Sequence, residues 1–292
     1  MKKILFTCFI IACLSHMAEA KEPNRKNEKK ETERVRPAWY FRGGLGYAMT
    51  DNGEYFGLYG VPTSGSVTYI NNGSTLSSYK YDKVSFDKGV NATIAGGIMF
   101  NRHVGIDLGI NIGLAPHQYT FTANGWDIDN NVVNSVIKTR AKSPLFIMPS
   151  LVMQTGSMPV NLYIRAGLVI PMNTKLTFDE QDSYVSNGIG IVQEYVSQVS
   201  NRFSLGYSAA IGVSYKLRGN TNIWAELSHV SLTADAKQSD LKSVTQNGVS
   251  IPLSNYNTTV TYTNSGGVND NDPSSEPFSS IGMNIGVSFR IK

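Results

Sequence analysis

Two residues, His229 and Ser231, have the types and the spacing that nucleophilic catalysis requires. They are separated by one residue in His229-Val230-Ser231, so on a strand both side chains point to the same face. An imidazole beside a hydroxyl can activate a serine nucleophile when a carboxylate orients the imidazole. The nearest carboxylates along the chain are Asp235 and Asp240. Because two residues alone are a weak signal, we expect an ordinary interfacial histidine and no enzymatic activity.

Six charged side chains form a second group of candidates, since each falls on the polar side of a segment with alternating polarity. They are Arg42, Asp107, Arg165, Lys216, Glu226 and Arg290. Charges that are buried between strands need partners of opposite sign. The sequence therefore predicts a polar network that fills the interior with ion pairs. The excess of basic groups leaves a weakly anion-selective channel as the alternative.

Metal and cofactor chemistry has less support. Oxygen-bearing side chains gather in residues 127–131 and 269–272, but neither run has the glycine and distal glutamate of a calcium loop. The two cysteines, Cys8 and Cys13, lie near the start of the chain. We expect no metal site and no cofactor.

The elements that must position these residues are visible as segments of period two, which is the pattern of a strand between two environments. In the last segment Ile281, Met283 and Ile285 alternate with Gly282 and Asn284. Eight such segments occur, with an apolar face outward and a small or polar face inward: residues 38–49, 90–100, 104–114, 145–154, 160–170, 203–216, 222–232 and 280–292.

The connections between these segments alternate in length. Residues 101–103, 156–159 and 218–221 are short polar turns, and residues 50–88, 115–143, 171–202 and 233–278 are long. This alternation predicts an all-β fold, an eight-stranded antiparallel up-and-down transmembrane β-barrel with four long extracellular loops and short periplasmic turns.

Strand-like runs within the loops are expected to extend the hairpins above the membrane. They cover residues 118–122, 175–178, 195–199 and 258–263. A soluble β-sandwich or lipocalin-type barrel also alternates, but it would turn its apolar face inward and place Gly109, Gly206 and Gly286 on a surface in water. That alternative fits the pattern less well, because small residues help to pack a narrow lumen.

The start of the chain predicts export. Lys2 and Lys3 precede an apolar run, and Ala18-Glu19-Ala20 has small residues where a signal peptidase cleaves. We expect residues 1–20 to be a removed signal peptide, 21–37 a charged periplasmic tail and 38–292 the barrel, with both termini periplasmic and the protein in the cell outer membrane of a Gram-negative cell. Lipidation of Cys13 is the competing interpretation.

Net charge excludes one class of partner. The formal charge of +4 becomes +3 when the two lysines and one glutamate of the signal are removed, which is too close to neutral to indicate nucleic acid. Charged residues make up only 16% of the chain.

The C-terminal segment resembles the assembly signal of bacterial outer-membrane proteins. In Asn284-Ile285-Gly286-Val287-Ser288-Phe289-Arg290-Ile291, the matching positions are Asn284, Gly286, Phe289 and Ile291, and the resemblance implies that the barrel-assembly machinery recognises them. Lys292 departs from the pattern, because many such chains end on an aromatic residue. Taken with the four-hairpin layout, the chain resembles the small outer-membrane β-barrel family that includes the OmpA transmembrane domain and OmpX.

His229 and Ser231 also resemble the His-x-Ser pair of an eight-stranded outer-membrane lipid A deacylase. The asparagine that follows the serine in that family is replaced here by Leu232.

These patterns predict an integral outer-membrane protein with a structural or surface-binding role through its extracellular loops and a lumen that side chains plug. A small porin-like channel with weak anion preference is the alternative, and a lipid A-modifying hydrolase using His229 and Ser231 is the third. The expected partners are outer-membrane lipids, the barrel-assembly machinery and a possible extracellular ligand bound by the loops.

Overall fold

The computed structural model describes residues 37–51, 57–58, 61–62, 65–69, 84–126, 132–156, 159–186, 188–262 and 275–291. The predicted signal peptide, Cys13, the charged tail up to residue 36, the oxygen-rich runs 127–131 and 269–272, and Lys292 lie outside these residues. The fold described below belongs to the unit Arg36–Lys292.

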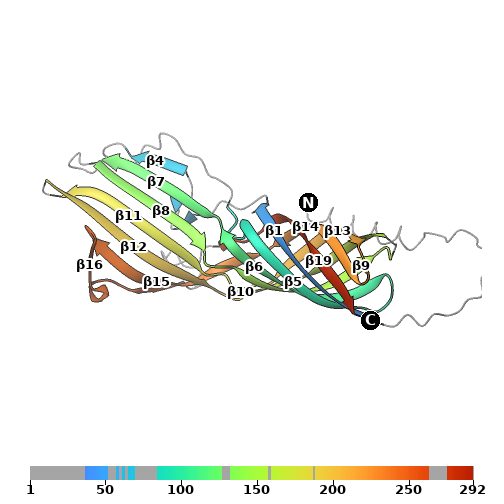
Figure 1. Ribbon diagram of the computed structural model, residues 1–292. Coiled ribbons are helices and arrows are strands. Elements are labelled where there is room, and N and C mark those ends of the chain that lie inside the picture. The colour runs from blue at the N-terminus through green and yellow to red at the C-terminus, as the bar shows by residue number, and fades with distance from the viewer. Residues whose placement is uncertain are drawn as a thin grey trace, which may run out of the picture. The chain divides into compact units, whose positions relative to one another are not determined.

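Eight antiparallel strands close into a barrel (Figure 1), which confirms the predicted fold class. Around the barrel the order is β1-β19-β14-β13-β10-β9-β6-β5. The bounds are β1 Ala38–Thr50, β5 Gly89–Met99, β6 Val104–Pro116, β9 Leu145–Gln154, β10 Val160–Asn173, β13 Gly206–Lys216, β14 Thr221–Ser231 and β19 Ser280–Ile291. Closure comes from pairing between the first and last of these strands, with Trp39 opposite Ile291 and Thr50 opposite Ser280.

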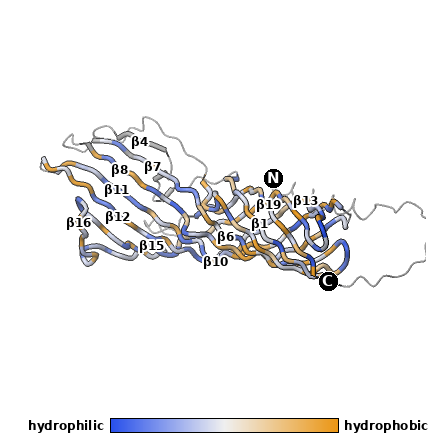
Figure 2. Tube along the Cα trace, in the orientation of Figure 1, coloured by the Kyte–Doolittle hydropathy of each residue, from blue (hydrophilic) through white to orange (hydrophobic). Residues whose placement is uncertain are grey.

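The alternating pattern turns apolar side chains outward, as predicted. On β19 the side chain of Ile285 is 67% exposed, whereas Asn284 is only 5% exposed. Figure 2 shows the same alternation of apolar and polar residues along the barrel strands. A closed ring of strands satisfies every backbone group along the wall, and its apolar exterior suits contact with lipid. Among the described residues, no helix has the length and hydropathy to cross a membrane.

Two glycines on neighbouring barrel strands make room for the Trp224 side chain. Trp224 lies opposite Gly286, and Gly286 lies opposite Gly44 on the next strand. A Cβ atom added to Gly44 would lie 2.6 Å from Trp224 Cζ2, and one added to Gly286 would lie 2.7 Å from the same atom. The two glycines therefore leave the space in which the indole ring lies.

All four long connections contribute strands to a second sheet, in the order β16-β15-β12-β11-β8-β7-β4. Three of them continue barrel strands β6, β10 and β14 directly, and the first contributes β4. The bounds are β4 Gly65–Tyr69, β7 Gln118–Trp126, β8 Val132–Ala141, β11 Leu176–Ser186, β12 Ile189–Asn201, β15 Thr233–Gln246 and β16 Val249–Ser250. Further pairing comes from β17 (Thr259–Thr261) and β18 (Ser275–Pro277), which both pair with β15, and from the short pair β2 (Gly57–Leu58) and β3 (Val61–Pro62). A single 3-10 turn, η1, covers Leu253–Asn255.

This second sheet is more extensive than the sequence predicted. The runs expected at 118–122, 175–178, 195–199 and 258–263 correspond to β7, β11, β12 and β17. The strands β8 and β15 were not predicted, because charged residues such as Lys138, Arg140 and Lys242 interrupt their apolar alternation. Most of the described part of these connections is therefore ordered strand rather than irregular loop.

An apolar core fills the lumen where the barrel meets the second sheet. Phe146 and Met148 of β9 and Val230 of β14 contribute to it from the barrel wall, and Phe86 and Phe278 contribute from the segments beside β5 and β18. The ring centroids of Phe86 and Phe278 are 5.8 Å apart, and those of Phe146 and Phe278 are 6.2 Å apart. The Phe86 amide donates a hydrogen bond to the Pro277 carbonyl at 2.9 Å. We call this cluster the apolar plug; it lies where the barrel joins the second sheet.

Candidate functional site

Four charged side chains meet in the middle of the lumen. Arg42 Nη2 lies 2.7 Å from Glu226 Oε2, Arg165 Nη2 lies 2.8 Å from Asp107 Oδ1, and Arg165 Nη1 lies 3.4 Å from Glu226 Oε1. All four residues are buried. We call this set the ion-pair belt, because it links strands β1, β6, β10 and β14.

Strand alternation and small neighbours place the belt. Each residue occupies an inward position, and its cross-strand partners leave room for a long side chain to reach across the lumen. Glu226 lies opposite Gly212 and Asn284, Asp107 lies opposite Gly97, and Arg165 lies opposite Ala210.

The belt is electrically balanced and well supported by neighbouring groups. Two guanidinium groups face two carboxylates, so its formal charge is zero, as buried charges require. The Tyr40 hydroxyl donates to Asp107 Oδ2 at 2.9 Å. The Arg42 guanidinium carbon lies 4.3 Å from the centroid of the Trp224 ring, a cation–π distance.

The other two predicted members, Lys216 and Arg290, are not part of this belt. Among the described residues neither forms a salt bridge, and both are only half-buried. Both lie near the short turns, where the Lys216 amide donates to the Pro159 carbonyl and the Arg290 amide donates to the Asn220 carbonyl. An inward position on a strand predicts which face a residue occupies, but not its depth in the lumen.

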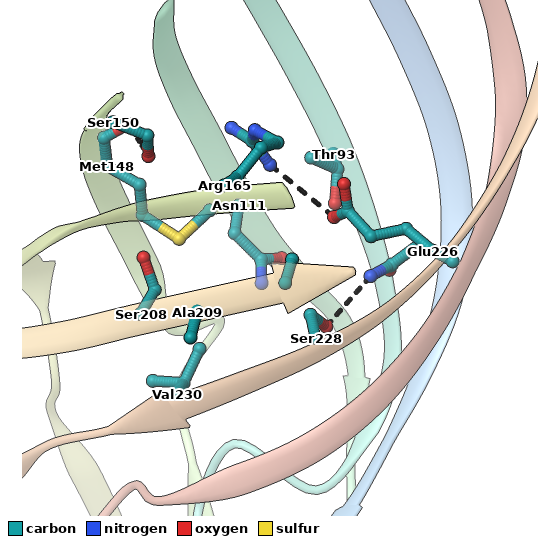
Figure 3. Close-up of a pocket in the computed structure, with 12 residues that line it drawn as sticks. Thr93, Asn111, Met148, Ser150, Arg165, Ser208, Ala209, Glu226, Ser228 and Val230 are labelled. Atoms are coloured by element: carbon teal, nitrogen blue, oxygen red, sulfur yellow. Dashed lines mark hydrogen bonds and ion pairs between the residues drawn. The ribbon is translucent and has the colours of Figure 1, made fainter. Parts of the chain in front are cut away.

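Two cavities lie along the lumen. The first is lined by Thr93, Asn111, Ser150, Arg165, Glu226 and Ser228, among others, and Figure 3 shows the Arg165–Glu226 ion pair within it. The second is lined by Tyr40, Arg42, Trp224 and Arg290, among others. Since the belt contributes residues to both cavities, it stands between them.

The first cavity has the character of a water site. Asn111 and Asn284 line it, and the side-chain oxygen of each is buried with no hydrogen-bond partner among the described residues. Buried waters usually satisfy such acceptors.

The candidate catalytic histidine has a carboxylate partner that the sequence did not indicate. His229 Nε2 lies 2.7 Å from Asp51 Oδ2, and the two residues are 178 positions apart. Asp235 and Asp240, the nearest carboxylates in sequence, instead accept hydrogen bonds from Ser275 and from Gln238 and Lys242. Among the described residues, the carboxylate hydrogen-bonded to His229 is therefore Asp51 rather than either of the two that are nearest in sequence.

Ser231 does not complete a catalytic triad in this structure. Among the described residues, no hydrogen bond joins it to His229, and the Nδ1 atom of His229 is buried without a partner. The ring of Tyr207 lies beside the imidazole, with centroids 6.0 Å apart. Within the described residues, the arrangement therefore supplies a histidine and an acid without a serine hydrogen-bonded to the imidazole.

The four residues of the predicted assembly signal occupy both faces of β19. The Asn284 side-chain amide donates to Ser228 Oγ at 3.0 Å, and Gly286 lies against Trp224. Phe289 and Ile291 are exposed on the outer, apolar face. In the described part of the chain, no group of three or more His, Cys, Asp or Glu side chains is placed to hold a metal ion.

A closed eight-stranded antiparallel barrel with an apolar exterior and a charged, balanced interior defines an integral β-barrel protein of the outer membrane. The chain belongs to the outer membrane protein beta-barrel domain family, whose model matches residues 61–263.

Several solved structures resemble this chain at low sequence identity. OprG from Pseudomonas aeruginosa is 11% identical with a TM-score of 0.43, and the match covers 88% of this chain and 97% of OprG. A major outer membrane protein from Thermus thermophilus is 11% identical with a TM-score of 0.37, covering 87% of this chain and 99% of that one. The attachment invasion locus protein Ail of Yersinia pestis is 11% identical with a TM-score of 0.29, covering 87% and 97%. No curated protein matches the chain in sequence.

Proposed function

We propose that this outer-membrane protein binds a ligand at the cell surface through the sheet that extends its barrel, while its lumen stays closed. The observation that carries the proposal is the second sheet itself. The long, regular strands β11 and β15 continue directly from barrel strands β10 and β14, and β12 leads into barrel strand β13. These three strands pair with one another over most of their length. A rigid platform of this kind is suited to presenting side chains to a partner.

The orientation is part of the proposal. Short turns on the periplasmic side and long connections outside the cell are the rule for outer-membrane barrels. Under that rule the second sheet is extracellular and both termini are periplasmic, which agrees with a cleaved signal over residues 1–20.

Binding by intact, surface-displayed protein to panels of host matrix proteins, lipids and glycans tests this proposal. The matched variant lacks residues 180–195, the outer half of the β11–β12 hairpin, but keeps Leu176, Phe178 and Val199 in the apolar core. We expect a panel ligand that binds the full chain and not the shortened one. Binding that is identical for both chains would contradict a role for the sheet, and the heat-dependent gel mobility of the folded barrel controls for assembly.

A small channel with weak anion preference is the second candidate. It is favoured by the cavities on both sides of the belt and by Lys216 and Arg290, which form no salt bridge among the described residues. It is opposed by the zero charge of the belt and by the apolar plug.

Hydrolysis of lipid A is the third candidate, and the Asp51–His229 contact is the observation that favours it. We expect the acyl pattern of lipid A to be the same in cells that express the wild type, His229→Ala or Ser231→Ala, as measured by mass spectrometry. Loss of an acyl chain only with the wild type would establish the hydrolase.

A further inference from the structure

One face of the second sheet gathers tyrosines and carboxylates above the apolar plug. We call it the inner face, because Leu176, Phe178 and Val199 of the apolar core lie on it. Farther along the same strands, Glu180 lies opposite Tyr195 and Asp182 lies opposite Gln193. Since side chains on a strand alternate between faces, these residues share the inner face with the core.

Three tyrosines and one glutamine order this surface. The Tyr184 hydroxyl donates to Gln193 Oε1 at 3.3 Å, and Gln193 Nε2 donates to the Tyr256 hydroxyl at 3.2 Å. The rings of Tyr195 and Tyr256 meet edge to face, with centroids 6.3 Å apart. Aromatic rings held in this way offer a fixed contact surface at low cost in conformational entropy.

Charge is divided between the two faces of the sheet. On the opposite face Asp179 lies opposite Lys138, and Thr177 lies opposite Arg140. On the inner face, the described positions of β8, β11 and β12 hold no Lys, Arg or His. On the described inner-face positions of these three strands, Glu180 and Asp182 are therefore the charged residues, and within the described residues neither forms a salt bridge.

Glu180 and Tyr195 on the inner face have shifted pKa values. Burial, and then the neighbouring Asp182, raise the pKa of Glu180 above its ordinary value. Burial followed by Tyr256 and Asp182 likewise raises the pKa of Tyr195. Both shifts have the sign expected where negative charge has no neighbouring cation.

We propose that the inner face, centred on Glu180, Asp182, Tyr195 and Tyr256, binds a basic peptide segment of a partner protein. The inference rests on the proposed surface-binding function and names its ligand chemistry. The two carboxylates would accept charge-assisted hydrogen bonds from Arg or Lys side chains. The tyrosine rings would receive the same cations over their faces, an interaction in which the planar guanidinium of arginine is favoured.

The test uses a fluorescein-labelled oligo-arginine peptide and the full chain refolded in uncharged detergent, with binding followed by fluorescence anisotropy. The double variant Glu180→Gln/Asp182→Asn removes both carboxylates from the inner face. Its matched control, Asp179→Asn/Glu194→Gln, removes the same amount of charge from the opposite face, one carboxylate from β11 and one from β12. We expect the first variant to weaken binding by about tenfold or more, and the control to change it by less than about twofold.

Tyrosine variants separate ring contact from charge. Tyr195→Phe keeps a ring face and should bind like the wild type, whereas Tyr195→Leu should bind several-fold more weakly. The inference is overturned if both charge variants weaken binding equally, if the wild type does not bind the peptide, or if free arginine competes as well as the peptide does. If panel ligands still require the β11–β12 hairpin in that case, the proposed surface-binding function holds and only the basic-peptide ligand is rejected.

Discussion

Arg165 and Asp107 form a two-point contact across the lumen, with Nε 3.0 Å from Oδ2 and Nη2 2.8 Å from Oδ1. Strand β9 separates the two strands that carry these residues. The pair therefore braces the barrel wall across its interior, and the further contact of Arg165 with Glu226 joins it to Arg42.

Loss of the Arg165 guanidinium should be costly. Arg165→Met leaves Asp107 buried without its cationic partner, and removal of one member of a buried pair costs about 3–5 kcal/mol. Urea unfolding of the protein in lipid vesicles measures the change in free energy. Arg290→Met is the control, because Arg290 is half-buried and forms no salt bridge among the described residues, and we expect a loss below about 1 kcal/mol. Equal losses in the two variants would contradict a structural role for the belt.

Neighbouring glycines on β1 should respond differently to the same substitution. In Gly44→Ala the added Cβ would lie 2.5 Å from the Ile285 carbonyl oxygen and 2.6 Å from the Trp224 ring, whereas Gly43 has no atom within 4 Å of an added Cβ. We expect Gly44→Ala to destabilise the barrel by about 1–3 kcal/mol through overpacking. Gly43→Ala should have little effect on the same unfolding curve, and a large loss in this variant would argue against the described strand orientation.

The apolar plug should loosen as pH rises from about 4 to about 7. Burial raises the pKa of Asp87 from its ordinary 3.8 to about 7, and the hydrogen bond from Ser280 opposes part of this shift. Because the folded form holds the proton more tightly than the unfolded form, the stabilisation is complete below pH 3.8, declines as pH rises and is lost above about pH 7.

Hydrogen exchange at the Phe86 amide, which donates to Pro277, reports on this region. After correction for intrinsic exchange, protection should fall between acid and neutral pH in the wild type and stay level in Asp87→Asn. A pH-independent protection factor in the wild type would show that Asp87 does not titrate in this range.

The barrel could be predicted from sequence because each strand faces lipid on one side, so its apolar alternation is nearly unbroken. Strands β8 and β15 could not be predicted from sequence. Both faces of the second sheet are partly polar, so charged residues such as Lys138 and Lys242 can lie on these strands and their sequences show no apolar alternation. The Asp51–His229 contact could not be predicted from sequence either. It forms because β19 pairs with both β1 and β14 and so brings together two strands that are far apart in the chain. The depth of a side chain in the lumen likewise depends on strand register. The sequence therefore grouped Lys216 and Arg290 with the four belt residues, although neither forms a salt bridge among the described residues.

The closed lumen is the central claim, and single-channel recording of the full chain refolded into planar bilayers tests it most directly. The ion-pair belt and the apolar plug predict no steady unitary conductance for the wild type. A steady and reproducible unitary conductance, carried by correctly folded protein, would contradict the account and favour the anion-preferring channel.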